Sequence, residues 1–215
     1  MTKQRSTEFR SAIEAAVTSF GLDPLTEHQI DRCAMHYEML RQWNERVNLT
    51  RIIRPAEAAR LHYAESMFGA RFIEDERTIL DIGSGAGFPA VQISIVRPDL
   101  EVTALEANQK KGLFLKEVKD ELGLTNLKVV TARLEEFSWA DYELLTSRAL
   151  DRAEAILPSV IQRLGANQRL MIYCARDLVA KLERGASLKT EIHAIPHSES
   201  RIIAILSRSA TANVC

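Results

Sequence analysis

The spacing of hydrophobic residues changes once along the chain, near residue 75. Before that point, apolar side chains recur every three or four positions, which is the periodicity of amphipathic helices. We therefore predict helices over residues 9–20, 26–43 and 54–72, the second with Thr26 as its N-cap. Residues 1–74 are expected to form a helical extension, followed by a differently built domain over 75–208 and a C-terminal tail over 209–215.

From Thr78 onward, short apolar runs alternate with helical stretches. Strands are predicted over residues 79–82, 102–105, 127–130, 142–146, 169–173, 192–195 and 202–206. Helices are predicted over residues 90–96, 109–122 and 152–164. Such alternation is typical of an α/β fold with a doubly wound, mostly parallel sheet.

The sequence TILDIGSGAGFP, over residues 78–89, combines the end of a strand, a glycine turn and the start of a helix. The turn contains three glycines, Gly83, Gly85 and Gly87. They permit positive φ angles and let a ligand approach the backbone. A dinucleotide fingerprint would need another glycine where Phe88 stands. Asp81, just before the turn, would repel a pyrophosphate and suits a cationic or amine-bearing ligand.

A second acidic residue, Glu106, ends the next predicted strand. It follows the glycine turn by about 20 residues, which is the place of a ribose-binding carboxylate. S-adenosylmethionine has an amino-acid end, a sulfonium and a ribose but no phosphate. Asp81 and Glu106 around a glycine turn fit this ligand. The alternative is that both acids cap helices or face solvent.

Ligands of doubly wound sheets bind beyond the carboxyl ends of the strands. The polar and glycine positions that stand out in this sequence fall at or just after such ends: Asp81, Gly83, Glu106, Leu134, Glu135 and Arg148. We therefore expect them to lie around one site. Residues 43–50, which hold a tryptophan and two asparagines, show no periodicity. They are expected to form a structured connection in which Asn48 and Thr50 cap the next element.

Composition narrows the class of protein. With 215 residues, 46% of them hydrophobic and 27% charged, the chain is typical of a globular protein. It contains no apolar run of about 18 residues, so no membrane span is expected. The polar start argues against a secretory signal, and three scattered cysteines indicate a reducing compartment, so a cytoplasmic location is expected. No cysteine or histidine spacing indicates a metal site.

The net charge of −1 means that the whole molecule does not attract nucleic acid strongly. A local basic patch remains possible in the N-terminal third. Arg51, Arg54 and, near the C-terminus, Arg201 are candidates for contacts with nucleic acid. Solvated helix faces are the simpler account of each of these residues taken alone.

Several motifs resemble one family of proteins. They are WNERVNLT at residues 43–50, HYAES at 62–66, LDIGSGAGFP at 80–89, KKGLFLKEV at 110–118, ARLEEF at 132–137 and SRA at 147–149. The glycine turn is similar to that of class I S-adenosylmethionine-dependent methyltransferases. The full set resembles, over residues 25–207, the bacterial 16S ribosomal RNA guanine-N7 methyltransferases, also called glucose-inhibited division protein B.

This resemblance implies a Rossmann-like fold whose last strand is antiparallel, with S-adenosylmethionine as cofactor. Gly83 and Phe88 would contact the cofactor in the turn, together with Gly85. Leu134 and Glu135 would flank its adenine, Glu106 would take the ribose hydroxyls, and Arg148 would line the pocket. The chain departs from the family pattern at Ala90, where a glycine is usual, and at Glu65, where an aspartate is usual.

The resemblance also implies the reaction and the partner. Methylation of guanine N7 in 16S ribosomal RNA needs no general base, so no catalytic residue is singled out. The small ribosomal subunit or an assembly intermediate is the expected substrate, and a monomer the expected state. The alternatives are a methyltransferase of the same fold acting on a small molecule or a protein, and a cofactor-binding RNA assembly factor without activity. A nicotinamide dehydrogenase is disfavoured by Phe88.

Overall fold

The computed structural model describes residues 2–148, 153–184 and 187–208. The tail 209–215 and the first residue predicted for the helix 152–164 lie outside this part. The N-terminal region is helical, as predicted. Its elements are α1 (Thr2–Ser19), α2 (Glu27–Asn44), α3 (Pro55–Ala58), the π-helical segment η1 (Ala59–Ala64) and α4 (Glu65–Ala70).

Thr26 caps α2, as predicted. Its hydroxyl accepts a hydrogen bond from the backbone N–H of Gln29, and the Gln29 side chain accepts one from the backbone N–H of Thr26. This reciprocal capping box satisfies two of the backbone donors that a helix start leaves unpaired. The start of α2 is therefore fixed by local sequence.

Seven strands form one sheet in the order β3-β2-β1-β4-β5-β7-β6. They are β1 (Thr78–Ile82), β2 (Glu101–Glu106), β3 (Leu127–Thr131), β4 (Leu144–Arg148), β5 (Arg169–Ala175), β6 (Leu188–Ala194) and β7 (Arg201–Arg208). The first five are parallel, and β7 runs antiparallel to both β5 and β6. The mostly parallel sheet and the antiparallel last strand are both as expected.

The remaining helices are α5 (Ala90–Val96), α6 (Gln109–Glu121), α7 (Ala153–Arg163), α8 (Arg176–Leu182) and the short 3₁₀ helix η2 (Leu134–Glu136). α8 was not predicted from the sequence. The fourth strand was predicted two residues too early, at 142–146 instead of 144–148. Tyr142 lies before the strand, where its hydroxyl donates to Oγ1 of Thr103.

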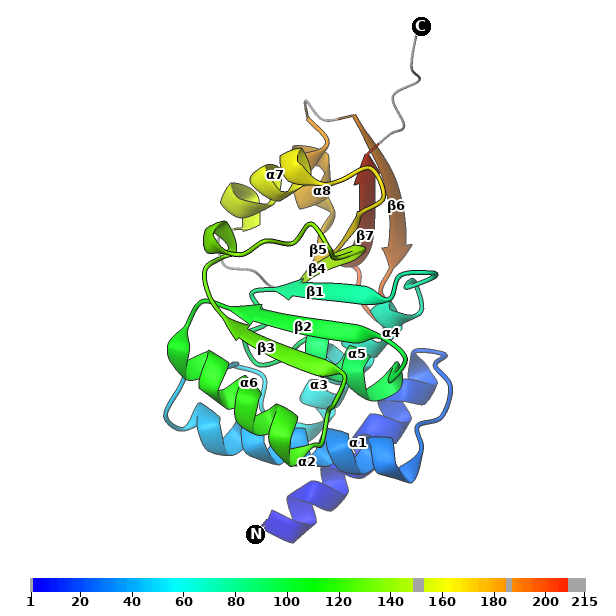
Figure 1. Ribbon diagram of the computed structural model, residues 1–215. Helices are drawn as coiled ribbons and strands as arrows, with labels where there is room; N and C mark the ends of the chain where they lie inside the picture. Colours follow the sequence, from blue (N-terminus) through cyan, green and yellow to red (C-terminus); the bar gives the residue numbers. More distant parts are fainter. Residues whose placement is uncertain (1, 149–152, 185–186, 209–215) are drawn as a thin grey trace, which may run out of the picture.

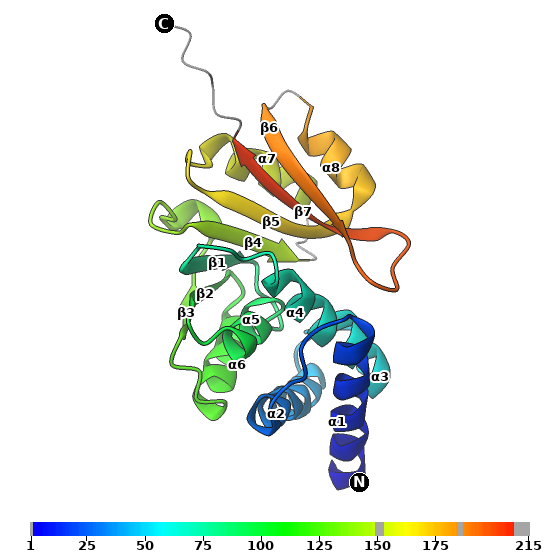
Figure 2. The same ribbon diagram turned by 90° about the vertical axis from the view of Figure 1, so that its right-hand side faces the viewer.

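Helices cover both faces of the sheet (Figures 1 and 2). Because side chains alternate along a strand, Ile79 packs in the core that α1 to α6 share, and Leu80 packs in the core under α7 and α8. The N-terminal helices thus belong to the same layer as α5 and α6. None of the described helices is long and apolar enough to span a bilayer.

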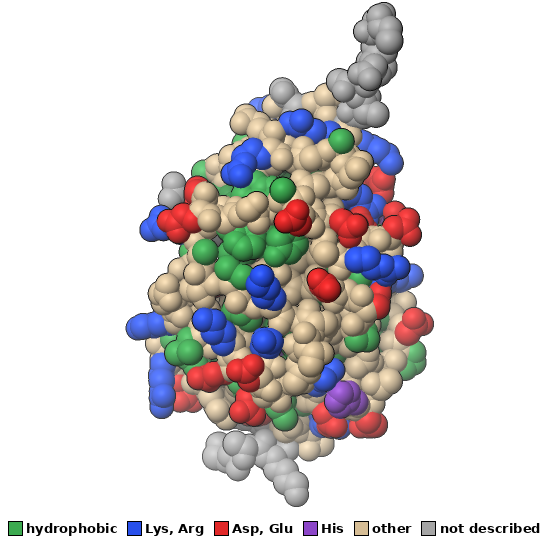
Figure 3. Space-filling view, in the orientation of Figure 1, with side chains coloured by type: hydrophobic (Ala, Val, Ile, Leu, Met, Phe, Trp, Pro, Cys, Tyr) green, Lys and Arg blue, Asp and Glu red, His purple; other side chains and the backbone are tan. Residues whose placement is uncertain are grey.

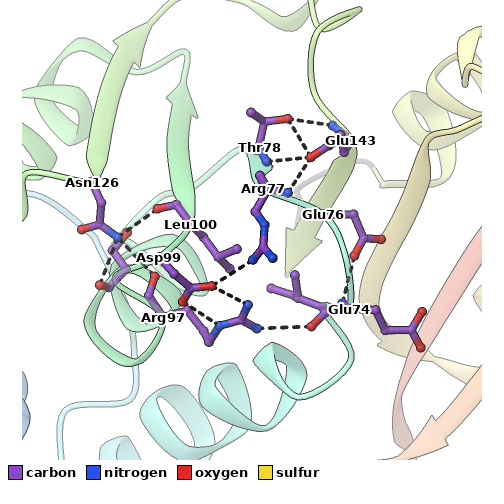
Figure 4. A network of polar contacts seen from close by, with 11 residues as sticks. Glu74, Glu76, Arg77, Thr78, Arg97, Asp99, Leu100, Asn126 and Glu143 are labelled. Atoms are coloured by element: carbon purple, nitrogen blue, oxygen red, sulfur yellow. Dashed lines mark hydrogen bonds and ion pairs between the residues drawn. The ribbon is translucent and has the colours of Figure 1, made fainter.

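A polar network fixes the strands at the end opposite to the glycine turn (Figure 4). Asp99 accepts hydrogen bonds from Arg97 and Arg77, and the Glu143 carboxylate accepts from the backbone N–H of Thr78 at 3.1 Å. The Asn126 amide donates to the carbonyl group of Ser94 in α5 and to those of Arg97 and Leu100 in the loop before β2. The amino ends of β1, β2 and β4 are thereby held together, which leaves their carboxyl ends as the open edge.

Candidate functional site

The carboxyl ends of β1, β2 and β4 border a cavity of about 1110 Å³. It lies where the strand order reverses, because β1 has β2 on one side and β4 on the other. Residues 48–51, the glycine turn, the segment around η2, and α7 complete its wall. Small-molecule pockets usually measure about 300–1,000 Å³. This cavity therefore has room for a cofactor and part of a second molecule.

The glycine turn has the backbone geometry that its sequence requires. Gly83, Gly85 and Gly87 have φ angles of 72°, 56° and 90°. A Cβ on Gly87 would lie 2.5 Å from Val91 Cγ2, so that position also excludes a side chain by contact. The backbone N–H of Gly83 donates to the Leu105 carbonyl at 2.9 Å. The turn is therefore anchored to β2 beside the cavity.

Glu106, the last residue of β2, lies on the cavity wall. Its Oε2 accepts from the backbone N–H of Gly85 at 2.9 Å, and its Oε1 accepts from that of Asn108 at 2.8 Å. A carboxylate oxygen has two lone pairs, so each oxygen can accept one more hydrogen bond. The carboxylate is thus oriented for a ligand with two adjacent hydroxyl groups, such as a ribose.

Asp81 does not lie on this wall. Along β1 its side chain points to the same face as Ile79, toward α5. Its Oδ2 accepts from the backbone N–H of Ala90 at 3.4 Å, and its Oδ1 has no hydrogen-bond partner among the described residues. Burial raises the pKa of this carboxyl to about 7. Asp81 therefore lies beneath the glycine turn and not on the cavity wall, and its contact with the ligand stays a prediction.

His36 of α2 supports the turn from the side of the N-terminal helices. Its ring is fully buried, and its Nε2–H donates to the Ala86 carbonyl at 3.0 Å. Its Nδ1 accepts from the Tyr63 hydroxyl, also at 3.0 Å. Burial lowers the pKa of His36 to about 4, so the ring is neutral, as one donor and one acceptor require. Sequence reasoning had placed His36 only among scattered histidines.

Arg148 ends β4 and is held by several partners. Its Nε donates to Glu65 at 3.4 Å, and its guanidinium also donates to the Leu61 carbonyl and, at 3.3 Å, to Nδ1 of His62. Arg201 of β7 pairs with the same Glu65 carboxylate at 2.9 Å. One buried carboxylate therefore joins two arginines from distant strands. Arg201, our candidate for an RNA contact, is thus held in an ion pair, and 34% of its side chain remains exposed.

The connection after α2 corrects one expectation. Asn48 and Thr50 do not cap the next helix, because the N-cap of α3 is Arg54, which makes no side-chain capping bond. Instead the Asn44 side chain accepts hydrogen bonds from the backbone N–H groups of Leu49 and Thr50. The chain turns there, and Asn48 and Thr50 come to lie on the cavity wall. The segment 43–50 was noticed in the sequence as a structured connection and as a family motif, but its place on the cavity wall was not predicted.

The structure brings most of the expected site residues together. Those on the cavity wall are Gly83, Gly85, Phe88, Glu106, Leu134, Glu135, Arg148 and Arg51. Asp81, Arg54 and Arg201 are not part of it. Phe88 contributes an edge, since its ring stacks on His62 with centroids 4.5 Å apart. His62 itself lines the cavity and was missed, although the motif that contains it was noticed.

These residues fit S-adenosylmethionine. Glu106 has acceptor capacity left for a ribose, the turn offers a bare backbone, and Leu134 provides an apolar side chain for an adenine ring. The cavity wall carries two glutamates, Glu106 and Glu135, and also basic side chains, those of Arg51, Lys111, Arg133 and Arg148. Among the described residues, no group of three histidine, cysteine or acidic side chains could hold a metal ion.

Two solved structures illustrate the proteins that share this fold. Precorrin-6y C5,15-methyltransferase from Geobacter metallireducens GS-15 superposes with a TM-score of 0.54 at 16% identity, covering 77% of this chain and 96% of that one. M. jannaschii TYW2 in complex with AdoMet superposes with a TM-score of 0.52 at 16% identity. The superposition covers 68% of this chain and 76% of that one. Fold and site together define a class I S-adenosylmethionine-dependent methyltransferase.

Sequence comparison narrows this class. The model of the GidB family, rRNA small subunit methyltransferase G, matches residues 29–200. Ribosomal RNA small subunit methyltransferase G of Neisseria meningitidis serogroup C (strain 053442) is 37% identical over 142 residues, 66% of this chain and 68% of the relative. The protein of the same name from Lactococcus lactis subsp. cremoris (strain MG1363) is 30% identical over 211 residues. The match covers 90% of this chain and 88% of the relative. This chain belongs to the rRNA small subunit methyltransferase G family.

Proposed function

We propose that this protein transfers the methyl group of S-adenosylmethionine to N7 of a guanine in 16S ribosomal RNA. Membership of the rRNA small subunit methyltransferase G family supports ribosomal RNA as the substrate. The protonation state of His62 supports N7 as the atom that accepts the methyl group. Both ring nitrogens of His62 are in hydrogen bonds, and burial beside Arg148 lowers its pKa to about 3. This histidine on the cavity wall is a poor proton acceptor, which favours a target atom that has no proton to lose.

Guanine N7 is such an atom, because it carries a free lone pair exposed at the major-groove edge. S-adenosylmethionine, when bound, supplies a methyl group on a sulfonium, which is already electrophilic. The protein then has to place N7 in line with that group, and positioning of this kind can contribute about 7–11 kcal/mol. The rigid turn, Glu106 and the buried Arg148 supply fixed positions for both reactants. Carboxylates on the wall, such as Glu135, stabilise the positive charge that the purine gains.

The proposed substrate form is the small subunit or an assembly intermediate, and the proposed enzyme is a monomer that acts in the cytoplasm. On the face shown in Figure 3, Lys and Arg side chains are interspersed with Asp and Glu, so no continuous basic field is present there. With a net charge of −1, free RNA would be held weakly. Faster methylation of assembled subunits than of naked RNA is expected, and equal rates would contradict this part of the proposal.

The decisive experiment maps N7-methylguanine in 16S ribosomal RNA. RNA from cells with and without the gene is reduced and treated with aniline, which cleaves the chain at N7-methylguanine. One cleavage site should vanish without the gene and return when the gene is supplied again. Identical cleavage patterns in both strains would refute the proposed target.

A matched pair of variants tests the cofactor site. Glu106→Ala removes the carboxylate proposed to accept from the ribose, and isothermal titration should show a loss of affinity for S-adenosylmethionine of about tenfold or more. Glu101→Ala removes an exposed carboxylate at the other end of β2 and should bind the cofactor like the wild type. Unchanged affinity of the Glu106 variant would place the cofactor elsewhere.

A further inference from the structure

Thr50 lies on the cavity wall, and its hydroxyl oxygen takes part in two hydrogen bonds. The backbone N–H of Ile52 donates to its Oγ1 at 3.1 Å. Its Oγ1 also lies 2.8 Å from Nε2 of His62. Which of these two atoms carries the shared proton decides what the hydroxyl can offer to a molecule in the cavity.

The hydrogen bonds of His62 settle that question. A guanidinium has only donors, so Nδ1 of His62 must accept from Arg148. The imidazole is neutral, because burial and Arg148 lower its pKa to about 3. Its single proton is therefore on Nε2, and Nε2–H donates to Thr50. The Thr50 oxygen thus accepts from both His62 and Ile52, which occupies both of its lone pairs.

A threonine hydroxyl normally donates or accepts as its partner requires. Here both lone pairs are in use, and the hydroxyl hydrogen has no acceptor among the residues that the structure describes. Thr50 therefore offers the cavity one hydrogen-bond donor and no acceptor. The chain from Arg148 through His62 makes this side chain selective for acceptor atoms.

We propose that Thr50 is a specificity-determining residue whose hydroxyl donates to O6 of the target guanine. This inference rests on the proposed function. Guanine carries an acceptor, O6, at the position where adenine carries an amino group. An adenine would set a donor against the donor of Thr50, so the site accepts guanine and rejects adenine.

O6 is the matching acceptor because N7 has to stay free. A donor on N7 would occupy the lone pair that attacks the methyl group. Donation to the neighbouring O6 holds the same edge of the base and leaves N7 available. The carboxylate of the cofactor's amino-acid end is the other acceptor that the cavity would contain, and the experiment separates the two.

The test is a double-mutant cycle between the hydroxyl and O6. The probes are small-subunit RNAs, assembled into subunits, with guanosine or 2-aminopurine riboside at the methylated position. 2-Aminopurine keeps N7 and lacks O6. Thr50→Val removes the hydroxyl at nearly constant size. We expect it to slow methylation of the guanosine RNA by about 10- to 100-fold, and to leave the slower methylation of the 2-aminopurine RNA unchanged.

The controls separate this role from a structural one. Thr50→Ser keeps the hydroxyl and should restore most of the guanosine rate, and both variants should bind S-adenosylmethionine like the wild type. Wild-type enzyme alone gives a second measurement, which does not depend on the variant folding. It should accept inosine, which has O6, and discriminate against 2-aminopurine.

Three results would overturn the inference. They are an equal fall of the Thr50→Val rate on both RNAs, a loss of cofactor affinity in Thr50→Val with no coupling to O6, and equal wild-type rates on inosine and 2-aminopurine. Failure of the proposed function looks different, because the wild-type enzyme would then leave the guanosine RNA unmethylated.

Discussion

Asp81 is fully buried, and its carboxyl group makes the stability of the fold depend on pH. Burial raises its pKa in the folded protein to about 7, from an ordinary value of 3.8. Between these values the folded protein keeps a proton that the unfolded chain releases. The stabilising contribution is therefore full below pH 3.8 and is lost as the pH rises through 7.

Asp81→Asn should remove this dependence. The free energy of unfolding of the wild type, relative to the variant, should fall by up to about 1.4 kcal/mol per pH unit between the two pKa values. Urea unfolding at several pH values measures the difference. Asp120→Asn changes an exposed aspartate of α6 and should show no such trend. Parallel pH profiles of Asp81→Asn and wild type would contradict the argument.

At the level of single residues, sequence could predict what local chemistry fixes. The three glycines follow from the turn that only they tolerate, and Glu106 follows from its place at a strand end. The direction of Asp81 was missed because the motif was considered without counting alternation along β1. The burial and the partners of His36 and Glu65 could not be predicted, because those partners come from segments far away in the chain.

Among the helices, α2 has a direct connection to the cofactor turn through His36. His36→Leu should leave the Ala86 carbonyl buried without a donor, and such a loss costs about 1–3 kcal/mol. The glycine turn would then be less well fixed. We expect affinity for S-adenosylmethionine to fall by about tenfold in isothermal titration.

His28→Leu is the matched control for this prediction, since it changes an exposed histidine on the same helix. It should bind the cofactor like the wild type. If His36→Leu and His28→Leu bound the cofactor equally well, α2 would support the fold without preparing the site.

Elements with strong periodicity were predicted well, and short ones were not. The 18 residues of α2 carry a capping box and an apolar face. The residue at which this helix starts and the face that it buries can therefore both be predicted from the sequence. The seven residues of α8 bury only Val179 and Leu182, which is too little for a periodic pattern. The π-helical turns of η1 depend on packing against α1 and could not be read from spacing.

On the scale of the whole molecule, Glu65 joins the N-terminal helices to β4 and β7. Glu65→Gln would leave Arg148 and Arg201 without their anion, one of them deeply buried. Breaking a buried ion pair on one side costs about 3–5 kcal/mol. Denaturant unfolding should show a loss of this size. Glu65→Asp keeps the charge and should lose clearly less, whereas equal stability of Glu65→Gln and wild type would show that the pairing is dispensable.

Because the protein as a whole has a net charge of −1, binding of RNA depends on individual basic side chains that contact phosphates. Arg51 on the cavity rim is a candidate for one of them. Arg51→Gln should lower the slope of log K against log salt concentration by about 1, measured by filter binding on the same RNA. Arg184→Gln, after α8 on the other side of the sheet, should leave the slope unchanged. A slope that Arg51→Gln does not alter would remove Arg51 from the interface.

The ion pair between Glu65 and Arg201 also has a consequence for synthesis. The two residues lie 136 positions apart, and Arg201 is on the last strand, which completes the sheet between β5 and β6. Until residues 201–208 have been synthesised, β5 has an open edge and Glu65 lacks one of its two cations. The arginine pair behind the site therefore cannot assemble before that strand has been made.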